Sequence, residues 1–352
     1  MFKYYRAETN DQEEYAFANG IIRKLDREIM TKELMESLLK SNDIIAALKI
    51  LNESDFFQSN FDISSPNDYE NALNMERLHY YDIIKNISKV SPFHFLYFTF
   101  ASKYDFQNLK IFIKSKFLKS EVPEDFISKI YTIKPSKLKA AIFDEKFEEI
   151  PHSYEFLIKK TILEYQKHRD PEKIDFILDK ERYLMVLNKI KEVEIIEPEE
   201  LFMKRFIRMN IDLHNIINCI RAKIRGEKKN FAKEFVIPSG DFKIGKIIEI
   251  FDSPLTTWIE KLTFTDYKNI IEEGITAYKK SNTLMEIERL KDNFILNFTK
   301  IGKYITFGIE PIIGFITAKE NDFKNIKIIL SGKLNNISEN NIKERLRDTY
   351  DE

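Results

Sequence analysis

Cysteine, glycine and proline are scarce in this 352-residue chain, which has one cysteine, nine glycines and ten prolines. Because Cys219 is alone, no intrachain disulfide can form. Few glycines and prolines argue against a fold with many tight hairpins and favour long helices joined by few loops. The 56 basic and 57 acidic residues leave a net charge of −1, so the overall balance indicates neither nucleic acid nor an anionic membrane as a partner.

Long apolar runs are also missing. The most apolar late stretch, residues 305–318, is too short to cross a bilayer and contains Glu310 and Pro311. Residues 1–11 include no apolar run, so no secretory signal is visible. We therefore expect a protein that stays inside the cell, without a transmembrane segment, whose membrane contact is peripheral or made through partners.

Catalytic and metal-binding patterns are missing as well. The five histidines show no pairing at metal-ligand spacing. The segment from Gly240 to Lys246 has the spacing of a phosphate-binding loop, but Ile247 stands where a magnesium-binding hydroxyl is needed, so we interpret it as a turn that opens a helix. Cys219 occupies an apolar slot and is interpreted as a core residue. The sequence therefore nominates no catalytic, cofactor-binding or metal-binding residue.

What the chain does contain is one helical pattern written three times. Each copy begins with Asp and has Asn three residues later, an apolar stripe at offsets of one, four, eight and twelve, and Lys at offset eleven. The repeated polar residues are Asp105, Asn108 and Lys116; Asp212, Asn215 and Lys223; and Asp322, Asn325 and Lys333. The pattern predicts three similar helices.

The spacing of the copies indicates domains. They follow one another after 107 residues (105 to 212) and 110 residues (212 to 322), which is too long for a solenoid unit and suits a small domain. We predict an all-α protein of three similar helical domains, with limits at residues 1–120, 121–230 and 231–352.

Two arrangements of the repeated Asp are compatible with the sequence. A proline-opened apolar segment precedes each copy, at Pro92, Pro198 and Pro311, and proline suits the first turn of a helix. Each Asp could then be the N-cap of a second helix. Alternatively, Asp and Asn lie within one continuous helix and bond sideways to a neighbouring helix.

The repeated lysines, Lys116, Lys223 and Lys333, also have two interpretations. A cation near a helix C-terminus is stabilised by the helix dipole by about 0.3–1 kcal/mol, and its stem covers apolar surface. If three domains surround one axis, however, the lysines could form a ring that presents positive charge to a shared partner. We take them as candidate interaction residues.

The C-terminal run from Phe307 to Leu334, which contains Glu310-Pro311 and the third copy of the repeat, resembles the C-type subunits of archaeal and bacterial V-type (A-type) ATPases. The eukaryotic counterpart of that family is the d-type subunit. Further similarity lies at residues 342–346 and in residues 15–23, which resemble the family's opening helix. The resemblance spans the whole chain.

This resemblance implies an all-helical, funnel-shaped protein with three domains about a pseudo-threefold axis. It also implies a non-catalytic rotor-coupling subunit on the cytoplasmic face of the membrane, where it joins the central stalk to the proteolipid ring. ATP hydrolysis or synthesis is thereby coupled to proton or sodium transport. The implied partners are central-stalk subunits of the D and F types and the proteolipid ring, with the membrane stator as a further candidate.

Other classes of function remain alternatives. A helical-repeat interaction scaffold unrelated to a rotary motor shares the predicted fold. A nucleotide site at residues 240–246 would make the chain an ATPase itself. Nucleic-acid binding would rest on a short basic patch at residues 221–229, which lacks interleaved aromatic residues.

Overall fold

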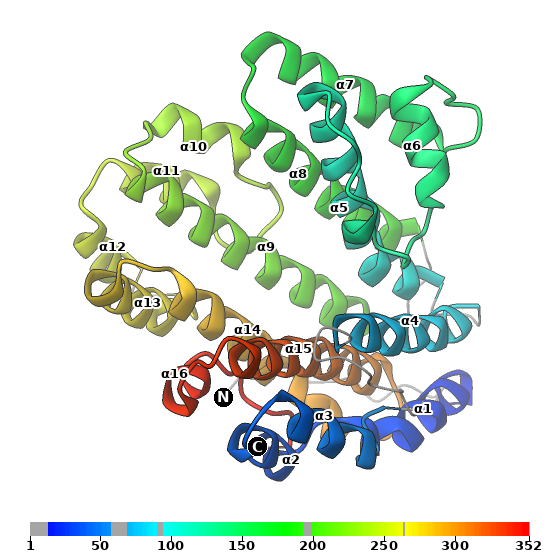
Figure 1. The fold of residues 1–352 in the computed structure, drawn as a ribbon. Helices are drawn as coiled ribbons and strands as arrows, with labels where there is room; N and C mark the ends of the chain where they lie inside the picture. The colour runs from blue at the N-terminus through cyan, green and yellow to red at the C-terminus, as the bar shows by residue number, and fades with distance from the viewer. Residues whose placement is uncertain (1–12, 58–68, 90–93, 193–198, 263–264, 352) are drawn as a thin grey trace.

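The computed structural model describes residues 13–57, 69–89, 94–192, 199–262 and 265–351 (Figure 1). Within these ranges the chain is helical and contains no β-strand, which confirms the all-α prediction. Pro92 and Pro198, two of the three prolines predicted to open helices, lie outside the described residues. Pro311 lies in the first turn of its helix, as predicted.

The helices vary from short connecting turns to rods of 26 residues. In chain order they are α1 (Glu13–Leu25), η1 (Asp26–Glu28), α2 (Lys32–Lys40), α3 (Ile44–Glu53), α4 (Tyr69–Ile87), α5 (His94–Leu118), η3 (Glu124–Phe126), α6 (Pro135–Phe143), α7 (His152–His168), α8 (Pro171–Glu192), α9 (Glu199–Ile224), α10 (Lys229–Phe235), α11 (Ile244–Phe251), α12 (Leu255–Lys261), α13 (Lys268–Ser281), α14 (Met285–Thr299), η4 (Lys300–Tyr304), α15 (Ile309–Leu334) and α16 (Glu339–Lys343).

The three longest helices, α5, α9 and α15, carry the three copies of the repeat. Their apolar stripes are buried at offsets of one, four and eight, as a helix with a core-facing stripe requires. The residues at offset twelve lie at the helix ends and are partly exposed; Leu334, for example, retains 37% of its accessible surface. The periodic pattern therefore predicted the buried face correctly, but it also included one residue, in the last turn, that is not buried.

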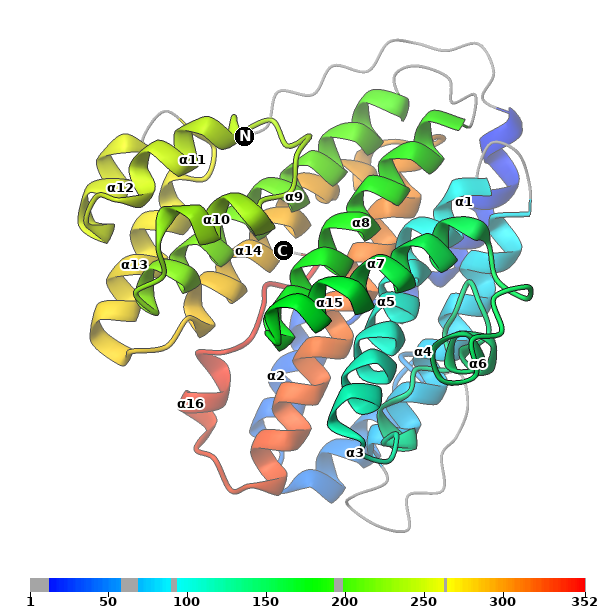
Figure 2. The same cartoon turned by 90° about the horizontal axis from the view of Figure 1, so that it is seen from above.

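Six helices close into a ring. Each helix contacts the next one in the order α5, α8, α9, α14, α15, α4, and α4 contacts α5 again. The three long helices therefore alternate with α8, α14 and α4. Figure 1 shows part of this order, with α15 between α14 and α4. Viewed from above in Figure 2, α5, α8, α9, α14 and α15 lie as neighbouring rods.

The N-terminal helices pack on the last long helix. α15 contacts α1, α2, α3 and α4, although about 220 residues of chain separate α4 from α15 (87 to 309). In Figure 1, α1, α2 and α3 lie beneath α15, and α4 lies beside it. By contrast, the C-terminal half of α5 forms a separate hydrophobic cluster with α6, α7 and α8, which follow it directly.

Gly302 in η4 sets how closely this turn approaches the start of α15. A Cβ atom at Gly302 would meet the carbonyl group of Glu310 and the Cα of Pro311, which are backbone atoms that cannot rotate away. We expect Gly302→Ala to lower the free energy of unfolding by about 1–3 kcal/mol. Chemical denaturation would measure this change.

The matched control is Gly20→Ala in α1, where a Cβ would meet no atom within 4 Å. This variant should be more stable than the wild type by about 0.5–1 kcal/mol, because alanine favours helix. Equal effects of the two substitutions would contradict the account of Gly302.

Candidate functional site

The repeated Asp and Asn residues lie inside continuous helices. Asp105 is in α5, Asp212 in α9 and Asp322 in α15, each about midway along the helix. The interpretation that Asp caps a second helix is therefore wrong, and the alternative of one helix with sideways bonds is correct in its first part. Most partners, however, are backbone groups of connecting segments, and only some, such as Tyr154 of α7, are side chains of another helix.

Each Asp carboxylate accepts backbone N–H groups that stand just before a short helix. Thr132 N–H donates to Asp105 at 2.9 Å, before α6. Phe242 N–H donates to Asp212 at 3.1 Å, before α11. Met30 N–H donates to Asp322 at 2.9 Å, before α2. The three carboxylates thus bind the entrance of three equivalent helices.

Each Asn forms a two-bond pair with one backbone residue. Asn215 Oδ1 accepts from Ile237 N–H at 2.8 Å, and Asn215 Nδ2 donates to the Ile237 carbonyl at 2.8 Å. Asn108 binds Ser128 and Asn325 binds Arg347 in the same way, with bonds of 2.8–3.1 Å. All three amides are buried, so the pairs satisfy polar groups that water cannot reach.

Each Lys binds the C-terminal end of the same short helix. Lys116 Nζ donates to the carbonyl of Ile142 in α6, and Lys223 Nζ to that of Asp252 after α11, at 3.3 Å. Lys333 Nζ donates to the carbonyls of Leu39 and Ser41 at the end of α2. Each lysine lies in the last turn of its own helix, as the helix-end interpretation has it, and its ammonium group also binds carbonyls at the end of a neighbouring helix. That the three lysines present charge to a shared partner stays a prediction.

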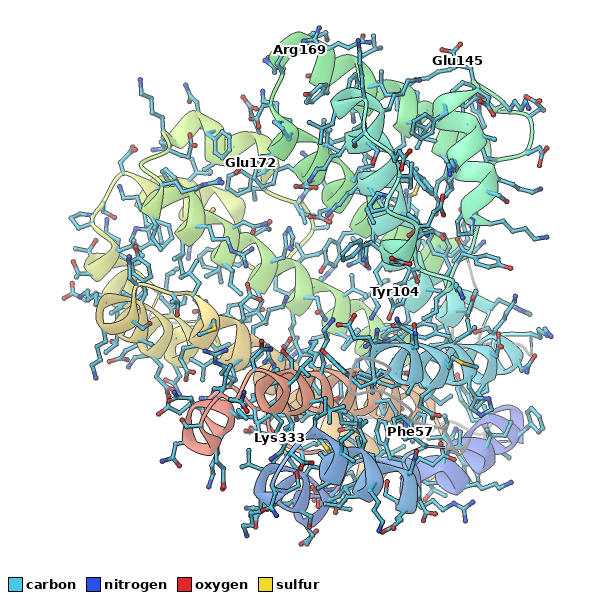
Figure 3. All side chains as sticks on the ribbon, in the orientation of Figure 1. Phe57, Tyr104, Glu145, Arg169, Glu172 and Lys333 are labelled. Carbon is cyan, nitrogen blue, oxygen red and sulfur yellow. The ribbon has the colours of Figure 1, made fainter. Side chains whose placement is uncertain are left out.

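The Asp, Asn and Lys of one long helix, with the backbone groups they bind, form what we call a clamp. Eleven residues of α-helix rise about 16 Å, which matches a parallel helix of two to three turns. One long helix thus binds both ends of a short helix and fixes its position along the axis. Figure 3 labels Lys333, on α15 close to the N-terminal helices.

The third clamp draws on both ends of the chain. Asp322 and Lys333 bind residues of the N-terminal segment, Met30, Leu39 and Ser41. Asn325 binds Arg347, which follows it by 22 residues, just as Ile237 follows Asn215. In the first two clamps every partner instead lies after the long helix. Contacts of the first clamp join residues on the two sides of residue 120, and contacts of the second clamp do the same at residue 230. The domain limits predicted at these two residues stay predictions.

Burial gives the clamp carboxyl groups unusual pKa values. It raises the pKa of Asp105 and Asp212 to about 6, although hydrogen bonds from Thr132 and Tyr267, respectively, act to lower it. The pKa of Asp322 is raised to about 7 by burial, against the Met30 N–H bond and the charge of Lys319. A buried carboxylate is costly without such donors.

Two tyrosines complete the first two clamps, and sequence reasoning missed them. Tyr267 Oη donates to Asp212 at 2.9 Å, and Tyr154 Oη donates to Asp105 at 3.4 Å. They follow their Asp by 55 and 49 residues, so no short motif connects them. A weaker signal did exist before the short helices, where an apolar residue precedes a polar N-cap: Ile133-Lys134, Phe242-Lys243 and Met30-Thr31.

A partly buried ion pair joins α5 to α15. Lys103 Nζ lies 2.6 Å from Glu320 Oε2, and Tyr81 Oη of α4 donates to the same carboxylate at 2.8 Å. Burial alone would raise the pKa of Glu320, but the charges of Lys103 and Arg77 lower it to about 2. In Figure 3 the neighbouring Tyr104 is labelled where α5 approaches α4. This pair ties the first long helix to the last.

The segment 240–246 has a structural explanation. A Cβ on Gly240 would overlap the Asp212 carboxylate, so glycine is needed for the second clamp. α11 begins at Ile244, which agrees with the predicted helix-opening turn. Cys219 is fully buried, and burial raises the pKa of its thiol, as suits a core residue. Among the described residues, no three His, Cys, Asp or Glu side chains are grouped to hold a metal ion.

Comparison with known proteins decides the family. Residues 18–345 match the profile of the ATP synthase (C/AC39) subunit family, and this range contains the six helices of the ring and the Asp, Asn and Lys of all three clamps. The chain belongs to this family. The resemblance noted from the sequence is therefore confirmed.

Relatives align over nearly their whole lengths. The chain is 25% identical over 339 residues to the C-type subunit of the V-type sodium ATPase of Enterococcus hirae, covering 96% of this chain and 99% of that protein. It is 25% identical over 348 residues to the C-type subunit of the A-type ATP synthase of Methanocaldococcus jannaschii, covering 94% and 86%. The corresponding protein of Methanosarcina barkeri is 24% identical over 353 residues, covering 96% and 94%.

None of the helices in the described ranges combines the length and apolar character needed to cross a bilayer.

The clamp amide can be tested at Asn215. Asn215→Ala would leave the buried N–H and carbonyl of Ile237 without partners and would open a small cavity. We expect the free energy of unfolding to fall by about 2–4 kcal/mol, measured by chemical denaturation. In the exposed control Asn335→Ala, whose amide binds Ser331 at the surface, the change should stay within about 0.5 kcal/mol. A small effect at Asn215 would show that the clamp is dispensable.

Asp322 should make stability depend on pH. Its pKa is raised from 3.8 to about 7 in the folded chain, so the folded state binds this proton more tightly than the unfolded state. The resulting stabilisation is complete below about pH 4 and is lost as pH rises through about 7. Relative to Asp322→Asn, the wild type should therefore lose on the order of 1–3 kcal/mol between these pH values. Denaturation at several pH values measures it, and a difference independent of pH would contradict it.

Proposed function

We propose that this chain is a non-catalytic rotor-coupling subunit of a V-type ATPase. In this role it joins the central stalk, with its D-type and F-type subunits, to the membrane proteolipid ring on the cytoplasmic face. ATP hydrolysis or synthesis is thereby coupled to proton or sodium transport. The observation that carries the proposal is the match to the ATP synthase (C/AC39) subunit family over residues 18–345.

The relatives support the proposal through their names. They are subunits of a V-type sodium ATPase and of A-type ATP synthases, and the chain aligns with 86–99% of the length of the three described above. A full-length relation favours the same place in a rotary enzyme over an independent scaffold. Transmission of torque requires stiffness and broad interfaces and no nucleophile.

We also propose that the three clamps mark three units about a pseudo-threefold axis, in a funnel-shaped molecule. Each unit would begin with a long helix, contain its clamped short helix and end with the next helix of the ring. The first would span residues 94–192 and the second residues 199–304. The third would combine residues 309–351 with residues 13–87, since its clamp binds both segments.

The ion pairs along the ring support this division. In the first unit Lys114 of α5 lies 2.7 Å from Asp175 of α8. In the second unit Arg221 of α9 pairs with Glu288 of α14. Lys114 and Arg221 both stand nine residues after the clamp Asp, so α8 and α14 occupy equivalent places. Matched charges at matched offsets favour one architecture for the first two units, whereas the third copy has Ser331 at this offset.

The test is an affinity purification of the tagged full-length chain from mildly solubilised membranes that contain an intact V-type ATPase. We expect central-stalk and proteolipid subunits to be recovered with it, identified by mass spectrometry. Recovery of neither from such membranes would contradict the proposal and leave the unrelated helical scaffold.

A charge swap provides the matched control for this purification. Glu320→Lys places a second cation beside Lys103. This should open the ring of six helices within the chain and reduce recovery of the partner subunits. The double variant Lys103→Glu, Glu320→Lys restores an ion pair and should regain recovery. If the single and double variants recovered the partner subunits equally, the closed ring of six helices would not matter for assembly of the complex.

A further inference from the structure

A small pocket lies between α15 and the C-terminal segment that folds back on it. Its volume is about 330 Å³. The charged side chains that line it all carry positive charge, and they come from both segments: Lys324, Lys327, Arg345 and Arg347.

The repeat architecture builds this pocket. Gly332 of α15 has no side chain, and this lets Ile342 of α16 approach the long helix, since a Cβ at Gly332 would overlap the Ile342 side chain. Asn325 of the third clamp holds the backbone of Arg347 by two bonds. The loop after α15 and the clamp therefore place Arg345 and Arg347 against the helix.

Acidic neighbours neutralise only part of the positive charge. Asp292 pairs with both Lys324 and Arg347, at 2.8 and 3.0 Å, so one carboxylate serves two cations. Lys327 pairs with Glu70 at 3.0 Å, and both side chains are more than half exposed. Among the residues that the structure describes, Arg345 has no acidic group within ion-pair distance. Four positive charges thus face two negative ones.

The positive region is confined to the small pocket. A larger groove of about 1430 Å³ adjoins it and shares Arg345 and Arg347, but that groove also carries acidic residues, including Glu272, Glu273 and Glu286. An extended polyanion laid along both hollows would meet these carboxylates. A single compact anionic group fits the small pocket alone.

We propose that this pocket binds a phosphoryl group. Two guanidinium groups and two ammonium groups around one hollow match the oxygens of a phosphate, because guanidinium can bind oxyanions through two parallel hydrogen bonds. Ile328, Ile337 and Ile342 line the same hollow and lower the local polarity, which strengthens such bonds. The group comes either from a small soluble phosphate or from the headgroup of an anionic lipid.

Calorimetric titration of the full chain with pyrophosphate, at constant ionic strength set by chloride, tests the proposal. We expect saturable binding that weakens about tenfold in Arg345→Gln, since a charge-assisted pair is lost. Arg345 is exposed, so this variant should keep its fold. The control Arg27→Gln removes an exposed arginine of η1 outside the pocket and should leave binding unchanged.

Three outcomes would overturn the proposal. They are equal affinities in the two variants, no saturable binding at millimolar pyrophosphate, and binding of a polyglutamate peptide without binding of pyrophosphate. The last result would indicate an acidic protein segment in place of a phosphoryl group.

Flotation with phosphatidylcholine vesicles distinguishes the two sources of phosphate. If binding requires phosphatidic acid in the vesicles, is lost in Arg345→Gln and is displaced by pyrophosphate, the ligand is a lipid headgroup. If pyrophosphate binds in calorimetry but the vesicles do not, the ligand is a soluble phosphate. Both results support the pocket as a phosphoryl site.

Discussion

The bond between a buried carboxylate and the entrance of a short helix is the interaction on which this architecture depends. A carboxylate within a helix interior is costly unless donors reach it from outside. Asp105, Asp212 and Asp322 obtain them from backbone N–H groups of another segment, which fixes where that segment enters its helix. The lysine eleven residues later binds the far end, so the two side chains together set the register of two helices.

Much of this arrangement could be predicted from the sequence, because it is local. The apolar stripe reports the buried face of one helix, and the Asp, Asn and Lys offsets repeat within a dozen residues. Whether Asp caps a helix or lies inside one could not be decided, since Asp followed by Asn three residues later suits both. The distinction depends on where the backbone partner lies, and that partner is at least 20 residues away in every case.

Contacts between distant segments could not be predicted from the sequence for the same reason. Nothing local connects Tyr267 to Asp212, or Lys103 to Glu320, and such pairs form only once the long helices are already side by side. The third copy has the most distant partner, because its short helix, α2, precedes it by nearly 300 residues (32 to 322). The four cations around the small pocket belong to the same class, since Lys324 and Arg345 meet only when the chain turns back after α15.

The division of the third clamp between the two ends of the chain has a consequence for synthesis on the ribosome. α1 to α4 emerge first, but α15, against which they pack, is translated some 250 residues later (87 to 334). At about 5–20 residues per second, this delay lasts roughly 10–50 s. During that time α15 is not yet available to cover the apolar faces of α1 to α4. The segment from α5 to α8, by contrast, can already form its own hydrophobic cluster. In a newly made chain the apolar faces of α1 to α4 therefore wait longer for their native partner than those of α5 to α8 do.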